Sequence, residues 1–114
     1  MQPAVDLAQL ARYTGGDREL NVEVLRLFEA QARILLKNLR EALDERDTRS
    51  WTRAAHGLKG AARGIGAFAL ADAAAFLEPN DLSVEAAAIA DLASLEVRAL
   101  EVQRFIGGYL ANAA

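Results

Sequence analysis

The chain has 114 residues, a net charge of −3 at pH 7, no cysteine and one histidine. This length fits one domain, residues 1–114, because a second domain would have no room for its own core. These counts exclude disulfides, thiolate metal sites and a histidine zinc cluster, and the acidic balance argues against general binding to nucleic acid or to anionic membranes.

The first predicted helix is short. It runs from about Asp6 to Tyr13 with Asp6 as its N-cap, and Gly15-Gly16 ends it. The residues before it lack the basic stretch and apolar run of a signal peptide, and no segment is long and uncharged enough to span a bilayer. We therefore expect a cytoplasmic protein that does not associate with membranes.

A long second helix is predicted from Asp17 to about Leu43. Apolar residues recur there in steps of three and four, which is typical of an amphipathic helix with one apolar stripe against a core. The stripe consists of Leu20, Val24, Leu27, Phe28, Ile34, Leu35, Leu39 and Leu43.

Three further helices follow. The third begins after an acidic turn, where Asp47 or Thr48 can cap it, and ends at Gly64-Ile65-Gly66. The fourth spans about Ala67 to Glu78, and a turn at Pro79-Asn80-Asp81 leads into the last, which Asp81 or Ser83 can cap. Its inward positions are Ala88, Leu92, Leu95, Ala99, Val102, Ile106 and Tyr109. The pattern predicts an all-α protein, an antiparallel up-and-down four-helix bundle with a short extra N-terminal helix.

The only histidine, His56, lies on the outward face of the third helix. With about 100° per residue, the residues within about 60° of it are polar or glycine, whereas the opposite side is apolar. The outward set is Arg49, Thr52, Arg53, Lys59, Gly60 and Arg63, and the apolar set is Trp51, Ala54, Ala55, Leu58, Ala61, Ala62 and Ile65. We therefore assign Trp51 to the core and expect an exposed imidazole.

Glycines gather around His56 although a glycine inside a helix costs about 0.5 to 1 kcal/mol relative to alanine. Gly60 lies one turn after His56 on the same face, so its missing side chain clears space for another molecule. Lys59 places an ammonium beside the ring, where it could neutralise a phosphoryl group. Because a neutral imidazole nitrogen is nucleophilic near pH 7 without a separate base, this arrangement suits a phosphoryl carrier and not a hydrolase.

The segment Ala55-His56-Gly57-Leu58-Lys59-Gly60-Ala61-Ala62, followed by Ile65-Gly66-Ala67, Leu70 and Leu77-Glu78, resembles the signature of histidine-containing phosphotransfer (HPt) domains. The resemblance implies that His56 accepts the phosphoryl group, that Lys59 assists it and that Gly60 permits docking. Gly57 and Gly64 depart from the usual polar residues, which puts the hydrogen bonds that orient the imidazole in doubt. Glu78, beside Pro79, could serve as a general acid, but we favour the interpretation that it is a surface carboxylate at a helix end.

The resemblance also implies a function and partners. We expect a monomeric phosphorelay carrier, without kinase activity of its own, that exchanges the phosphoryl group with an aspartate of a response-regulator receiver domain. A sensor or hybrid histidine kinase is the expected donor, with Arg53, Arg63 and Thr52 on the docking rim. No cofactor is expected on this chain, and Mg²⁺ would belong to the receiver. The alternative is a helical adaptor or scaffold without phosphoryl chemistry.

Overall fold

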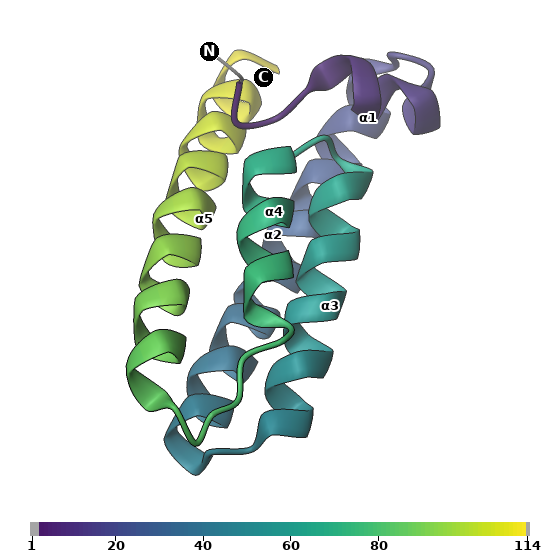
Figure 1. Ribbon diagram of the computed structural model, residues 1–114. Coiled ribbons are helices and arrows are strands. Elements are labelled where there is room, and N and C mark those ends of the chain that lie inside the picture. The colour runs from purple at the N-terminus through teal and green to yellow at the C-terminus, as the bar shows by residue number, and fades with distance from the viewer. Residues whose placement is uncertain (1–2, 114) are drawn as a thin grey trace.

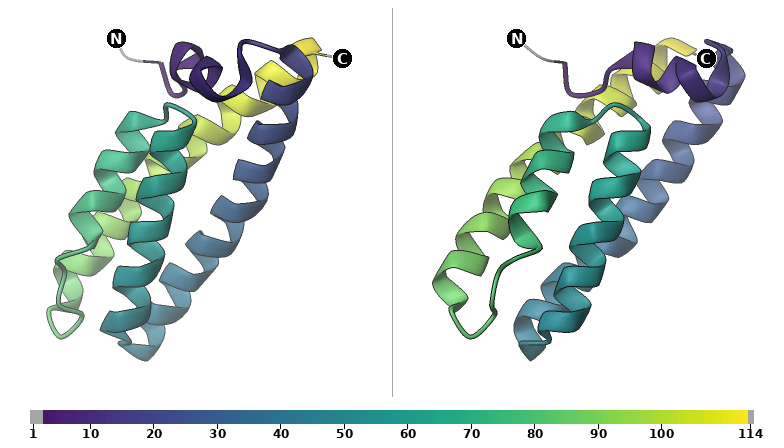
Figure 2. Two further views of the ribbon diagram at one scale, coloured as in Figure 1. Left: turned by 90° about the vertical axis from the view of Figure 1, so that its right-hand side faces the viewer. Right: turned by 45° about the vertical axis from the view of Figure 1, so that its right-hand side comes forward.

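The computed structural model describes residues 3–113, and these residues form helices and no strand (Figure 1). The helices are α1 Leu7–Thr14, α2 Arg18–Glu45, α3 Thr48–Gly64, α4 Phe68–Leu77 and α5 Glu85–Ala113. α2 to α5 lie side by side and the chain reverses direction at each turn, while α1 lies across one end (Figures 1 and 2). This confirms the predicted all-α bundle with a short extra helix. Of the expected domain, Met1, Gln2 and Ala114 lie outside the described residues.

Aspartate side chains cap three of the helices. Asp6 accepts a hydrogen bond from the backbone N–H of Ala8, and Asp47 accepts one from Ser50. Asp17 does the same at the start of α2. The hydroxyl of Ser50 also donates to Asp47 and is the main reason why the pKa of that carboxyl is lowered. The predicted caps at Asp6 and Asp47 are confirmed, whereas Asp81 closes the turn before α5 through the N–H of Ser83.

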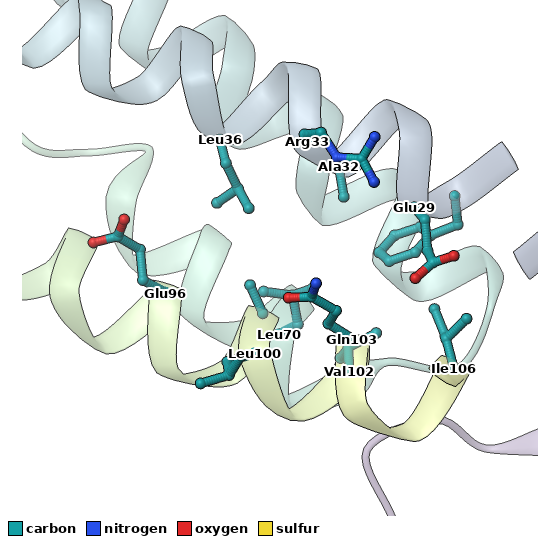
Figure 3. Close-up of a pocket in the computed structure, with 12 residues that line it drawn as sticks. Glu29, Ala32, Arg33, Leu36, Leu70, Glu96, Leu100, Val102, Gln103 and Ile106 are labelled. Atoms are coloured by element: carbon teal, nitrogen blue, oxygen red, sulfur yellow. The ribbon is translucent and has the colours of Figure 1, made fainter. Parts of the chain in front are cut away.

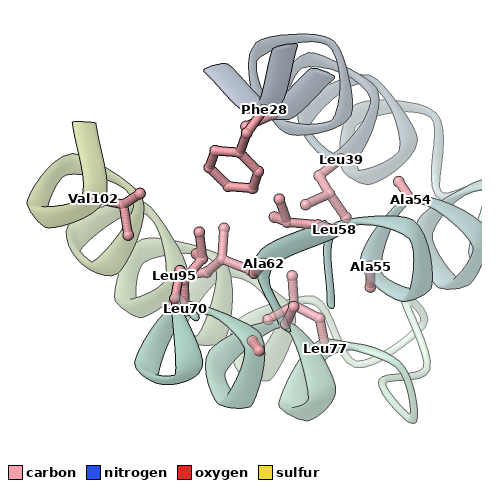
Figure 4. Packing of buried hydrophobic residues seen from close by; sticks show 14 of the residues in the cluster. Phe28, Leu39, Ala54, Ala55, Leu58, Ala62, Leu70, Leu77, Leu95 and Val102 are labelled. Atoms are coloured by element: carbon pink, nitrogen blue, oxygen red, sulfur yellow. The ribbon is translucent and has the colours of Figure 1, made fainter. Parts of the chain in front are cut away.

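One apolar core fills the space between the helices (Figure 4). Trp51 is fully buried in it, as predicted. The predicted inward stripe of α5 is also confirmed, because five of its members are buried and Ala99 and Tyr109 are partly buried. The five are Ala88, Leu92, Leu95, Val102 and Ile106. The buried face of α3 consists of Trp51, Ala54, Ala55, Leu58 and Ala62.

The predicted stripe of α2 is wrong in part. Leu20, Leu27 and Ile34 are 45%, 65% and 60% exposed, whereas Leu25, which the stripe omitted, is fully buried. The reason is that apolar residues cover a wider arc of α2 than one core can bury. The three exposed residues recur every seven positions and share one face, about 100° or more from the face that carries Leu25. They form an apolar strip at the surface.

The loop between α3 and α4 is tied to the N-terminal segment. The N–H of Asp6 donates to the carbonyl of Gly66 at 2.9 Å. Gly66 has φ +77°, and a Cβ atom there would lie 2.6 Å from the carbonyl oxygen of Asp6. Only glycine therefore permits this close approach without displacement. The hydrogen bond between Asp6 and Gly66 therefore holds the turn that joins the end of α3 to the start of α4.

Candidate functional site

The helix α3 presents His56 to solvent. The imidazole side chain is 74% exposed, and Thr52, Arg53 and Gly60 on the same face are exposed as well. The side of α3 opposite to them is buried against the other helices. The predicted orientation of α3 is therefore confirmed, because the apolar residues of this helix occupy one side and leave the histidine on the other.

Glu78, at the C-terminal end of α4, joins His56 and Lys59. Its Oε1 atom lies 2.7 Å from Nζ of Lys59 and 3.3 Å from Nδ1 of His56. Glu78 lies at a helix end as expected, but its side chain is only 24% exposed and is paired with both residues, which the sequence did not predict. The two segments are 22 residues apart in the chain, and the packing of α4 on α3 brings them together. The Leu77-Glu78 pair within the motif was the only signal in the sequence that could have indicated it.

The contact with Glu78 selects one form of the neutral imidazole. An ionised carboxylate can only accept hydrogen bonds, so Nδ1 of His56 carries the hydrogen in this contact. The Nε2 atom then keeps its lone pair, and it belongs to a side chain that is mostly exposed. The hydrogen bond from Lys59 is the largest cause of the lowered pKa of Glu78, which keeps the carboxylate ionised at neutral pH. This interaction supplies the orienting hydrogen bond that the glycines around His56 do not.

Lys59 is less exposed than its place on the helix predicts. Only 17% of its side chain is accessible, because it leans toward α4 and forms an ion pair with Glu78. The ammonium is still within one helical turn of the imidazole. It is thus held in a defined position beside His56 and does not extend freely into solvent.

On one flank of His56, α3 offers little side-chain bulk. A Cβ atom added at Gly60 or Gly64 would meet nothing within 4 Å, and one added at Gly57 would make ordinary contact with Leu35 of α2. Leu27 of the exposed strip of α2 lies on this flank, together with the exposed Tyr13 of α1. A shallow depression here is lined by Tyr13, Val24, Leu27, Phe28, Gln31, Ala61, Gly64 and Ile65. We call this surface the apolar flank.

The other flank of His56 is basic. A surface depression beside the imidazole is lined by Thr48, Arg49, Thr52, Arg53, His56 and Glu78. Arg49 and Arg53 are both exposed, and neither forms an ion pair with any residue between 3 and 113. We call this surface the basic flank. Of the predicted rim residues, the structure places Arg53 and Thr52 here, whereas Arg63 lies about two turns beyond His56 in the direction of α1.

A separate groove of about 330 Å³ runs between α2 and α5 (Figure 3). Apolar side chains such as Leu36, Leu70 and Leu100 line it, with Glu29 and Arg33 at its rim. None of the predicted site residues contributes to this groove. In the part of the chain that the structure describes, no group of three or more His, Cys, Asp or Glu side chains could hold a metal ion. No helix in that part has the length and apolar character needed to cross a membrane.

A comparison with family models places these residues in context. The model described as Hpt domain matches residues 23–104, which is most of the chain and includes His56, Lys59 and Glu78. The match begins within α2 and ends within α5, so α1 lies outside it. Neither the curated proteins nor the solved structures contain a match.

Proposed function

This chain belongs to the Hpt domain family, whose members carry a phosphoryl group on histidine in two-component phosphorelays, and we propose that His56 is the carrier residue. The observation that carries the proposal is the position of Oε1 of Glu78, which contacts both His56 and Lys59. It leaves one exposed imidazole with a free Nε2 atom and a cation held nearby. No second nucleophile or base is needed, because a neutral imidazole attacks unaided near pH 7.

The proposed transfer step uses this geometry. Nε2 of His56 attacks the phosphorus of an aspartyl phosphate on a receiver domain, so an N–P bond forms while the O–P bond breaks and the aspartate leaves as a carboxylate. The imidazole then carries both the phosphoryl group and the Nδ1 hydrogen, and its ring is positively charged. Glu78 stabilises that charge through the same hydrogen bond, while Lys59 offers its ammonium to the phosphoryl oxygens. The reverse step returns the group to the aspartate.

The two flanks of His56 support a receiver as the partner. The basic flank carries Arg49 and Arg53 in a chain whose net charge is −3, so positive charge is concentrated where an acidic partner would approach. The aspartyl phosphate of a receiver is itself anionic, which complements this charge. The apolar flank offers Leu27 and Tyr13 as contact area, and an exposed apolar cluster of this kind typically marks a protein interface.

The same proposal includes the wider setting. We assign donation of the phosphoryl group to a sensor or hybrid histidine kinase that uses the same exposed face. Mg²⁺ is assigned to the receiver, and the carrier contributes alignment and charge, which dominate catalysis of phosphoryl transfer. We propose that the carrier acts in the cytoplasm as a monomer.

Gly60→Gln tests docking separately from folding. Glutamine is a better helix former than glycine, so the free energy of unfolding should stay level or rise by up to about 1 kcal/mol. The melting temperature should follow it. Its side chain would stand beside His56, where the receiver must bring its aspartate into line with Nε2. We therefore expect slower transfer from a phosphorylated receiver, together with normal labelling of His56 by phosphoramidate. Rates are followed with radiolabel, using the receiver that transfers fastest in a screen of receiver domains.

Gly107→Gln is the matched control. Gly107 also lies inside a helix, α5, and a Cβ atom there would also meet nothing within 4 Å. Both variants gain helix propensity, but only the one at Gly60 changes the surface beside His56. Equal transfer rates in the two variants would contradict docking at Gly60. An absence of phosphohistidine by mass spectrometry under alkaline conditions, with every donor tried, would favour the adaptor alternative.

A further inference from the structure

The C-terminal end of α4 lacks the usual means of capping its carbonyl groups. The helix ends at Leu77, and the next residue, Glu78, keeps right-handed helical angles of φ −54° and ψ −45°. No glycine in the left-handed conformation follows, and Pro79 has no N–H to donate. The last carbonyls of a helix need donors from outside it. At this end, the local turn supplies one donor, the backbone N–H of Asn80, to the carbonyl of Leu77, and further donors come from α3.

α3 supplies two side-chain donors to this end of α4. The indole Nε1 of Trp51 donates to the carbonyl of Leu77 at 2.7 Å, and this hydrogen bond is buried. The hydroxyl of Thr52 makes a longer contact of 3.4 Å with the carbonyl of Glu78, and the N–H of Asn80 completes the shell of Leu77 at 3.1 Å. Trp51 is fully buried, so its ring has little freedom to move and the position of its N–H is fixed.

The carbonyl that Trp51 holds immediately precedes Glu78. The backbone at this point determines how far the carboxylate of Glu78 reaches toward α3, where Oε1 contacts Lys59 and His56. α3 therefore carries His56 and Lys59 on its outer face. On its inner face it carries Trp51, whose N–H holds the backbone next to Glu78. A displacement of the end of α4 by 1 Å would lengthen the contact of 3.3 Å to His56 beyond hydrogen-bonding range.

We propose that Trp51 is a positioning residue for the phosphotransfer site. Its indole N–H anchors the end of α4, and through Glu78 it sets the tautomer of His56. This inference rests on the function proposed above, because it gives Glu78 a role at His56. Thr52, expected on the docking rim, assists as a second anchor.

The test replaces the indole N–H while keeping the ring. Trp51 is the only tryptophan, so 3-benzothienylalanine, in which sulfur replaces the N–H group, can be incorporated at this position alone. Trp51→Phe is the second variant. ¹⁵N NMR of the single histidine at pH 8 reports its tautomers, and ¹³C NMR of the glutamate carboxyls reports the titration of Glu78. We expect the ratio of the Nδ1–H to the Nε2–H tautomer to fall by up to about fivefold, the change that corresponds to the roughly 1 kcal/mol of one ordinary hydrogen bond.

Two reference variants frame the result. Glu78→Ala removes the carboxylate and gives the tautomer ratio without its acceptor. Ile106→Val trims a fully buried side chain of α5 and lowers the melting temperature without removing a donor from α4. If the benzothienyl variant keeps the wild-type tautomer ratio and Glu78 titration, Trp51 is a core residue only and the proposal is wrong. A shift in the tautomer ratio confirms that Trp51 anchors the end of α4. If the ratio shifts but labelling of His56 by phosphoramidate is unchanged, the proposed role of Glu78 in transfer is contradicted instead.

Discussion

The contact of α3 with α4 and the contact of α2 with α5 differ in how tightly they are packed. α3 and α4 pack closely through small residues, and polar contacts cross between them at Trp51 and Lys59. α2 and α5 stand apart over the groove of about 330 Å³, which is bridged at its edge by the exposed ion pair of Arg40 with Glu96. The candidate site lies on the first pair of helices.

This difference indicates where the fold must be accurate. Phosphoryl transfer depends on alignment of a nucleophile and a charge within fractions of an ångström, and only tightly packed helices hold side chains in that way. The pair of α2 and α5 carries none of the predicted site residues, so a loose fit there has no cost for the chemistry. Changes at the α3–α4 pair should therefore affect activity more strongly than equal changes at the α2–α5 pair.

His56→Gln should have the largest effect. It removes the only imidazole of the chain, so phosphoryl acceptance should fall below detection with phosphoramidate or a phosphorylated receiver as donor. Because the side chain is 74% exposed, stability should stay within about 0.5 kcal/mol of wild type. Radiolabelling and circular dichroism measure the two effects. Retained labelling would overturn the assignment of the carrier residue.

Matched substitutions in the two pairs of helices test the packing difference itself. Ala71 lies seven residues before Glu78, so it occupies the same side of α4 toward α3, and it is 1% exposed. Ala71→Leu should lower the free energy of unfolding by about 1 to 3 kcal/mol through overpacking. Ala99→Leu extends into the groove between α2 and α5 and should be neutral or stabilising by up to about 1 kcal/mol. Urea denaturation of both variants checks this, and equal losses would show that the two pairs are packed alike.

Lys59→Ala should slow phosphoryl transfer by about tenfold, since a charge-assisted contact to the phosphoryl group contributes on the order of 1.5 kcal/mol. The free energy of unfolding should also fall, by about 1 to 3 kcal/mol, because the ion pair with Glu78 is mostly shielded from water and the substitution removes the nearest cation of that carboxylate. Transfer reactions quenched at successive times measure the rate of transfer, and the lifetime of the phosphohistidine is measured separately. Arg40→Ala, which breaks the ion pair across the α2–α5 groove, is the control and should leave transfer unchanged.

The smallest expected effect is the pH dependence of the Glu78 interactions. The pKa of Glu78 is lowered below its ordinary value of 4.5 in the folded protein, so its ionised form stabilises the fold above that value. This contribution is lost as the pH falls through the lowered pKa. The difference in stability between wild type and Glu78→Gln should therefore shrink from pH 6 to about pH 3. A constant difference over this range would mean that the carboxylate charge of Glu78 does not matter for folding.

The sequence by itself determined most of the local structure. The caps at Asp6 and Asp47, the helix end at Gly15 and the outward direction of His56 could all be predicted, because each depends on neighbours within a few residues of helix. Helical periodicity alone separates His56 and Gly60 from the buried Trp51. The family motif around His56 is likewise a local pattern, and the match over residues 23–104 agrees with it.

The tertiary structure decided which residues meet across helices. Periodicity could not show that Leu20, Leu27 and Ile34 lie outside the core, because α2 has more apolar surface than its neighbours cover. It also could not place Glu78 against His56 and Lys59, or Leu77 against Trp51, since these contacts join segments 19 to 26 residues apart through the packing of α4 on α3. A helix wheel gives the direction of a side chain, but its partner depends on how two helices are rotated and displaced relative to each other, and that is set by the whole core.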